Sequence, residues 1–124
     1  MKNIRFNNLD AALLYSFPAP PSDLAKIVWY FTSTNRTYPP TFEQITNCLN
    51  KGMRVGIIRE DGGLFVIDDI WYGKIHMADD SAGNEIEAMM EFQDGFVNVD
   101  FNETTDATCS LTEADYESML AKLR

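Results

Sequence analysis

The sequence has few of the residues from which metal sites and catalytic triads are built. Its 124 residues include one histidine, His76. A single histidine excludes a metal site with two histidine ligands, and a serine–histidine–aspartate triad would depend on this residue alone. The surrounding residues, Ile70 to Met77, predict a strand, in which His76 is more simply a strand residue than a general base. We therefore assign no catalytic residue, no metal site and no cofactor, and we expect a protein that is not an enzyme.

Cysteine is also scarce, and the glycines form no phosphate-binding loop. The two cysteines, Cys48 and Cys109, lie far apart and in no CxxC pattern, so we expect two reduced thiols. A disulfide between them would require their two segments to meet. Neither Gly52-x-x-x-Gly56 nor Gly62-Gly63 is followed by the lysine of a phosphate-binding loop, so turns and helix ends explain these glycines better.

Long apolar runs are missing. No stretch approaches the roughly 18 apolar residues of a membrane span. Residues 1–17 lack the continuous apolar core of a signal peptide, because Asn7, Asn8 and Asp10 interrupt it. We therefore expect a cytoplasmic protein without a membrane partner.

Basic residues are outnumbered by acidic ones. The chain has 10 lysines and arginines against 19 aspartates and glutamates, which gives a formal net charge of −9. Such a surface repels nucleic-acid phosphates and attracts basic proteins. The charge therefore disfavours nucleic acid as a partner and favours a basic protein. The length and the ordinary globular composition, 45% hydrophobic and 23% charged, predict one domain over residues 1–124.

The clearest pattern that is present is a capped helix followed by a hairpin, between Pro39 and Ile67. Thr41 and Gln44 have the spacing of a capping box. Apolar residues then recur at helical spacing: Phe42, Ile45, Leu49 and Met53. Gly56 suits the left-handed position that ends a helix, and Asp61-Gly62-Gly63 predicts a tight turn between strands at residues 57–60 and 64–67.

A second helix is predicted before this one, after a proline-rich connector at residues 17–21. Ser22 or Asp23 would cap it, and its apolar stripe is Leu24, Ile27, Val28 and Phe31. Trp29 and Tyr30 widen that stripe, which leaves open a homodimer formed through this helix. Nearer the N-terminus, residues 3–6 suggest a short strand and the residues after Asn8 a short helix.

Beyond the hairpin, the pattern predicts strands over residues 70–77, 86–92 and 97–102, with Gly73 as a candidate bulge in the first of them. A second hairpin turn is predicted at Asp94-Gly95, between the last two strands. A capping box of Ser110 and Glu113 then opens a closing helix. The fold class that follows is α+β, with N-terminal helices, a hairpin, further antiparallel strands and a C-terminal helix.

The strand predicted over residues 86–92 would have one acidic face, because acidic and apolar residues alternate there. Apolar side chains nearby would complete a surface suited to a lysine- and arginine-rich partner; these are Met89, Met90, Phe92 and Phe96. The candidate binding residues are Glu85, Glu87, Glu91, Asp100, Met89 and Phe96.

Two pairs of carboxylates flank the strand predicted over residues 70–77. Asp68-Asp69 precedes it and Asp79-Asp80 follows it. A divalent cation or an acid/base pair is one reading of these residues. Solvated strand ends that discourage edge-to-edge pairing are the reading we favour.

The segment from Ser22 to Ile67 resembles the latter part of a winged-helix domain. In that family a helix ends in a glycine, a strand follows, and a short hairpin forms the wing. The resemblance implies a regulator that touches DNA phosphates, here through Lys51, Arg54 and Arg59, with the wing at Asp61 to Gly63. Residues 41–54 have room for one helix rather than two, and the wing tip is acidic, so the resemblance suggests shape rather than activity.

In size and charge the chain is similar to small bacterial toxin-immunity proteins, which neutralise basic toxins. This resemblance implies a protein-binding module without catalytic residues. We therefore rank three hypotheses: a module that binds a basic protein, a winged-helix-like regulator, and a small-ligand enzyme that uses His76 and neighbouring aspartates.

Overall fold

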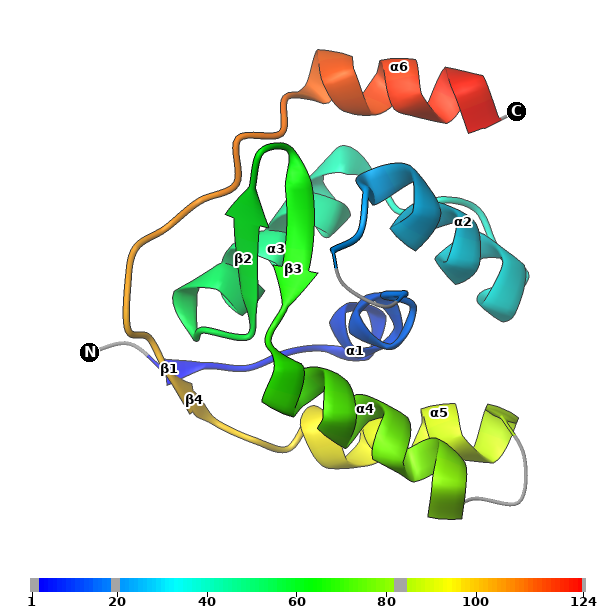
Figure 1. Cartoon of the computed structure of the whole chain (residues 1–124), viewed down its shortest axis with the longest axis vertical. Coiled ribbons are helices and arrows are strands. Elements are labelled where there is room, and N and C mark those ends of the chain that lie inside the picture. Colours follow the sequence, from blue (N-terminus) through cyan, green and yellow to red (C-terminus); the bar gives the residue numbers. More distant parts are fainter. Residues whose placement is uncertain (1–2, 19–20, 82–84, 124) are drawn as a thin grey trace.

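The computed structural model confirms the α+β class. It describes residues 3–18, 21–81 and 85–123, without the side chains of residues 76–81, 85–86 and 88–89. Within these residues there are six helices and two small antiparallel sheets, with 56% of the chain helical and 12% in strands. The helices lie above and below one central helix, α1 (Figure 1).

Helix α1 (Asn8–Tyr15) forms the centre of the core, and its residues from Asp10 onward are all buried. Asn7 and Asp10 form a capping box at its start, with the Asp10 amide donating to the Asn7 side chain over 2.8 Å. The helix contacts α2, α3 and α5, so it is covered on several sides. Leu9 and residues 11–15 of this short helix are all apolar or aromatic, so they suit a position that is covered on several sides.

Helix α2 (Leu24–Asn35) buries the predicted apolar stripe, Leu24, Ile27, Val28 and Phe31. Asp23 caps it by accepting from the Lys26 amide at 2.8 Å. It ends at Arg36, whose φ of 49° is left-handed and therefore unusual for a residue with a side chain.

Helix α3 (Phe42–Arg54) confirms the prediction at both ends. The Gln44 amide donates to the Thr41 hydroxyl at 3.1 Å, and the Thr41 amide donates to the Gln44 side chain at 2.9 Å. At the other end Gly56 has a φ of 82°, and the Ile57 amide donates to the Gly52 carbonyl at 2.9 Å. This is the glycine-dependent helix ending that the sequence indicated.

The predicted hairpin is also present, as β2 (Ile58–Asp61) and β3 (Leu64–Ile67). Ile58 pairs with Ile67 and Asp61 with Leu64, and positive φ angles at Gly62 and Gly63 make the turn. On its other side β3 is extended by one bridge, in which the amides and carbonyls of Ser22 and Phe65 exchange two hydrogen bonds of 2.9 and 2.8 Å.

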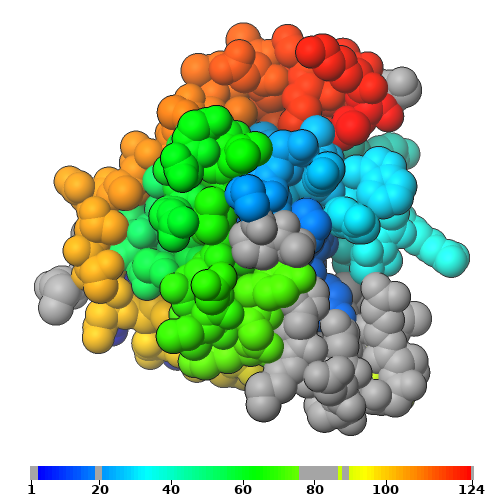
Figure 2. Space-filling view, in the orientation of Figure 1, coloured from blue at the N-terminus to red at the C-terminus, as the bar shows by residue number. Residues whose placement is uncertain are grey.

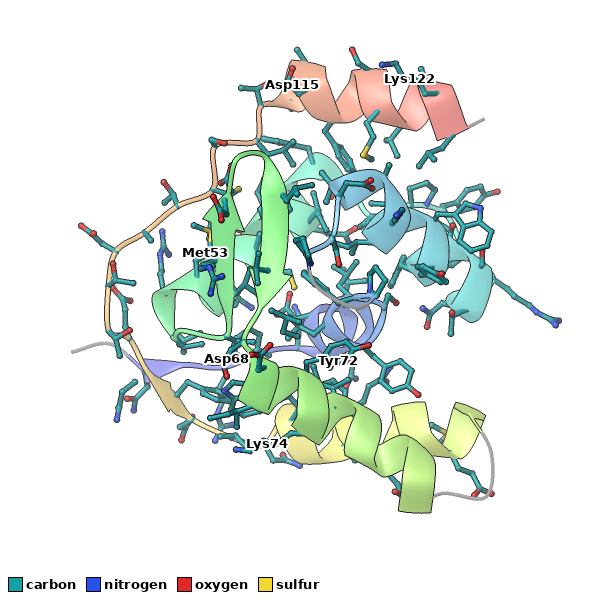
Figure 3. All side chains as sticks on the ribbon, in the orientation of Figure 1. Met53, Asp68, Tyr72, Lys74, Asp115 and Lys122 are labelled. Atoms are coloured by element: carbon teal, nitrogen blue, oxygen red, sulfur yellow. The ribbon has the colours of Figure 1, made fainter. Side chains whose placement is uncertain are left out.

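The strands predicted over residues 70–77 and 86–92 are wrong. These segments are helices α4 (Asp69–Ser81) and α5 (Glu85–Phe96). The Asp68 carboxylate caps α4 by accepting from the amides of Ile70 and Trp71, at 3.1 and 3.3 Å. Figure 3 shows Asp68 where β3 leads into α4. In α5, glutamate, methionine and alanine are good helix formers, and their preference outweighs the alternation that we read as a strand.

The return strand predicted over residues 97–102 is reduced to β4 (Phe101–Asn102). It pairs with β1 (Asn3–Ile4), which confirms a short N-terminal strand. The turn predicted at Asp94-Gly95 lies instead within α5.

Aromatic side chains hold α4 and α5 against the N-terminal segment. The ring of Phe96 lies 4.7 Å from that of Phe6 and 5.4 Å from that of Phe101, measured between centroids. Trp71 of α4 contacts the same group, 5.7 Å from Phe96. The pair α4–α5 is therefore anchored on residues from both ends of the chain.

The C-terminal segment is extended from residue 103 to residue 112 and ends in helix α6 (Glu113–Leu123). It passes along the outer side of β2 before α6 crosses over the hairpin and α2 (Figures 1 and 2). The predicted capping box at Ser110 is wrong: Thr112 caps α6 by accepting from the Asp115 amide at 3.2 Å, and the Ser110 hydroxyl binds the Glu60 carboxylate. Buried Tyr116 fixes α6 in place by donating to the Pro40 carbonyl at 2.5 Å.

Candidate protein-binding surface

The outer side of α5 carries three acidic residues in one stripe. Glu87, Glu91 and Asp94 are spaced i, i+4 and i+7, which puts them on one face of a helix, and all three are exposed. Met90 lies beside them and has 56% of its surface exposed. We call Glu87, Met90, Glu91 and Asp94 the acidic face of α5.

The opposite side of α5 fixes this face in space. Phe92 stacks on Phe96 with ring centroids 5.0 Å apart, and Phe92 also lies 6.1 Å from Tyr15 of the central helix. Because Phe96 is buried in the core and Phe92 packs against it, α5 is held in one orientation and its acidic residues face solvent.

The structure separates the six predicted binding residues. Glu87 and Glu91 are exposed on α5, whereas Phe96 is 4% exposed and belongs to the core. The side chains of Glu85 and Met89 lie outside the described residues. The rule that grouped Glu85, Glu87 and Glu91 was strand alternation, which does not apply to a helix.

Asp100 is exposed but already has a cation. Its carboxylate lies 2.5 Å from the Arg5 guanidinium. The hydrogen bond from Arg5 holds the pKa of Asp100 below its ordinary value, and the same bond raises the pKa of Arg5. Asp100 therefore contributes less net charge to a binding surface than the sequence suggested.

Sequence reasoning did not list Met90 or Asp94 as binding residues. It counted Met90 only among the apolar side chains near the acidic face, and it placed Asp94 in a hairpin turn. The signal that would have found them is the helical repeat, since Glu87, Glu91 and Asp94 match it as well as residues 86–92 match strand alternation.

The three basic residues of the predicted DNA-contacting surface lie in different settings. The Lys51 ammonium lies 2.6 Å from the Asp10 carboxylate, which is itself buried. The Arg54 Nε donates to the Ala107 carbonyl at 3.2 Å. Arg59 on β2 is exposed. Two of the three cations are therefore held by the protein's own acceptors.

The C-terminal extended segment also lies against α3, the helix that would face DNA. The Thr104 amide donates to the Arg54 carbonyl at 2.8 Å, and the Cys109 amide donates to the Asn50 side chain at 2.8 Å. Near the wing tip, Glu60 accepts from the Ser110 amide at 2.8 Å, and Asp61 is exposed. The C-terminal segment therefore covers part of α3, and the wing tip is acidic. Neither feature favours contact with DNA phosphates.

The two carboxylate pairs do not come together. Asp68 and Asp79 are near opposite ends of α4, about 16 Å apart at 1.5 Å per residue. The side chains of His76, Asp79 and Asp80 are outside the described part of the chain. Among the residues that are described, no group of three or more histidine, cysteine, aspartate or glutamate side chains could hold a metal ion.

Both cysteines are free thiols, Cys48 buried and Cys109 partly buried. Burial raises the pKa of Cys48 well above its ordinary value, and the nearby Asp10 carboxylate adds to this. Burial also raises the pKa of Cys109. A thiol with a raised pKa is a weak nucleophile at neutral pH, which argues against a catalytic role for either.

A second exposed surface lies on α2 and is aromatic. Trp29 is 53% exposed, Tyr30 is 43% exposed, and Tyr38 in the following loop is 89% exposed. Two open hollows flank Trp29, of about 610 and 370 Å³, and Leu123 of α6 lines both. Tryptophan and tyrosine in such numbers are typical of protein interfaces.

Comparisons of the chain with protein-family models, curated proteins and solved structures return no match. In the part of the chain that the structure describes, no helix is both long and apolar enough to cross a membrane.

Proposed function

We propose that this protein is a binding module that engages a basic protein through the acidic face of α5. The observation that carries the proposal is the exposed stripe of Glu87, Glu91 and Asp94 with the exposed Met90 beside it. Carboxylates on a solvent-facing helix attract a lysine- or arginine-rich surface and raise the rate of encounter. A methionine next to them offers an adaptable apolar contact once the water has left.

The net charge of −9 supports the same proposal, because the field of the whole chain attracts a basic partner from a distance. The similarity in size and charge to toxin-immunity proteins gives one class of such a partner, a basic toxin. Inhibition of that partner would follow if α5 covers the basic surface that the partner uses on its own target.

A winged-helix-like regulator is the second candidate. The two helices α2 and α3, joined by residues 36–41 and followed by the hairpin, support that shape, although residues 42–54 form one helix rather than two. The engagement of Lys51 by Asp10 and of Arg54 by Ala107 leaves Arg59 to meet phosphate. A single arginine supplies little of the electrostatic attraction on which DNA binding depends, so this candidate ranks below the first.

The test compares two charge-reversed variants with the natural protein. The first changes Glu87, Glu91 and Asp94 to lysine. The matched control changes three other exposed acids, Asp61, Asp106 and Glu117, to lysine, so both variants have the same net charge. Each tagged protein is used to capture partners from a lysate of its source cells, at low and then moderate salt.

The proposal predicts that the natural protein and the control capture the same basic protein, and that the α5 variant loses it. Equal loss by both variants would mean that net charge alone attracts the partner, and undiminished capture by both would mean that neither surface binds it. Either outcome would refute the assignment of α5. Saturable binding of duplex DNA, weakening steeply with salt, would favour the regulator instead.

A further inference from the structure

The exposed face of α2 combines aromatic and polar residues at helical spacing. Lys26, Trp29, Tyr30 and Ser33 are spaced i, i+3, i+4 and i+7, and all four are exposed. The Trp29 and Tyr30 rings meet edge to face with centroids 5.1 Å apart, so they form one aromatic ridge. Contiguous exposed apolar surface of this kind is typical of a site where another molecule binds.

This face differs in charge from the rest of the chain. Residues 23–36 include Lys26 and Arg36 but one acidic residue, Asp23, so the segment is net positive in a chain of net charge −9. Two copies of an acidic protein repel each other through most of their surfaces. A second acidic copy is therefore repelled least at α2, whereas a basic partner is attracted to the acidic face of α5.

Asp23 and Arg36, the opposite charges that cap the two ends of α2, are equally spaced along the sequence from its aromatic centre. We propose that two copies of the chain form a dimer through antiparallel α2 helices, with the two-fold axis between Trp29 and Tyr30. That axis brings Trp29 opposite Tyr30 of the second copy. It also brings Asp23 opposite Arg36 of the second copy, and Lys26 opposite Ser33 of the second copy. Each charged end of the helix thus meets the opposite charge, as an isologous interface requires.

The hollows beside Trp29 give the second copy's rings a place to pack. One is lined by Ala25, Tyr30 and Leu123, and the other by Val28, Pro39 and Leu123, among others. A tyrosine or tryptophan seated in each hollow would be covered by apolar side chains on several sides. Because one helix pair is a small interface, we expect a dissociation constant in the micromolar range.

The decisive test uses Ser33, which lies opposite Lys26 of the second copy in this arrangement. Ser33→Glu creates two attractive pairs across the axis, and Ser33→Lys creates two repulsive ones. We expect the first variant to dimerise about fivefold more tightly than the natural protein and the second about fivefold more weakly. The mass of each purified protein is measured by sedimentation equilibrium over a range of concentrations. Ser33 is exposed, so both variants should fold normally.

A further variant, Trp29→Ala, removes the centre of the interface and should leave a monomer throughout this range. A natural protein that stays monomeric at the highest concentration would overturn the proposal. So would equal affinities for Ser33→Glu and Ser33→Lys, since another register or another surface would then form the dimer. The measurement uses the purified chain alone, so its outcome does not depend on whether α5 binds a basic protein.

Discussion

The ammonium of Lys51 lies 2.6 Å from the carboxylate of Asp10, and this ion pair joins α3 to α1 inside the protein. The Asp10 side chain is 2% exposed and that of Lys51 is 27% exposed. The Asp10 carboxylate also accepts from the Asn7 amide at 2.9 Å, so one residue both caps the central helix and holds α3 against it. A buried carboxylate of this kind requires its cation, because an unpaired charge in the core is very unfavourable.

We therefore expect Lys51→Ala to lower the free energy of unfolding by about 3 kcal/mol, measured by urea denaturation. The matched control is Arg5→Ala, which breaks the exposed ion pair with Asp100. Exposed pairs contribute little because water screens them, so the control should change stability far less than Lys51→Ala does. If the two variants lost equal stability, the Lys51–Asp10 pair would not have the structural role that its burial indicates.

The alkaline stability of the protein should depend on Tyr116. Burial raises the pKa of this tyrosine to about 12, from an ordinary value near 10, and its hydroxyl donates to the Pro40 carbonyl. The folded state therefore keeps the proton to a higher pH than the unfolded state does. The stabilisation is fully present below pH 10 and is lost as the pH rises from about 10 to about 12.

Tyr116→Phe tests this, since phenylalanine keeps the ring and cannot titrate. Near pH 7 the variant should be less stable by about 1 kcal/mol, because the Pro40 carbonyl loses its donor. Above pH 10 the difference should shrink, because the natural protein alone loses stability through this group. Urea denaturation of both proteins at several pH values measures the difference. A constant difference across the range would contradict the raised pKa.

The two cysteines should react with thiol reagents at very different rates. Cys48 is 0% exposed, with its Sγ 3.7 Å from the Asp10 carbonyl oxygen, whereas Cys109 is partly exposed. We expect Cys109 to react first under native conditions and Cys48 to react only as the protein opens. The number of cysteines that have reacted, followed over time, measures this difference. In a Cys109→Ala variant the fast phase should vanish; if it remained, Cys48 would be more accessible than its burial allows.

The features that the sequence predicted correctly depend on neighbouring residues. The Thr41–Gln44 capping box, the Gly56 helix ending and the Gly62-Gly63 turn each arise from contacts within a few residues. Such contacts can be recognised in a single sequence because the residue types are restricted by backbone geometry.

The features that were predicted wrongly depend on distant contacts or on an ambiguous repeat. The sequence placed Phe96 on the binding surface, but Phe6 and Phe101 bury it. It counted Asp100 as a free charge, but Arg5, from the other end of the chain, binds it. Nothing near these two residues in the sequence reveals either partner. For residues 86–92, alternation and the helical repeat both fit, and helix preference decided between them.

The helical assignment of residues 69–81 can itself be tested at Gly73. Among the described residues, a β-carbon at this position would meet no atom within 4 Å apart from its chain neighbours and its own helix backbone. Glycine is also unfavourable within a helix. Gly73→Ala should therefore raise the free energy of unfolding by about 0.5 to 1 kcal/mol, measured by urea denaturation. The contrast is Gly52→Ala in α3, where a β-carbon would lie 2.5 Å from the Ile58 Cδ1 and 2.9 Å from its Cγ1. There the crowding should outweigh the helix preference and cost about 1 to 3 kcal/mol. Destabilisation by Gly73→Ala would instead favour the strand, with a bulge at this glycine, because a bulge can require the backbone freedom that alanine lacks.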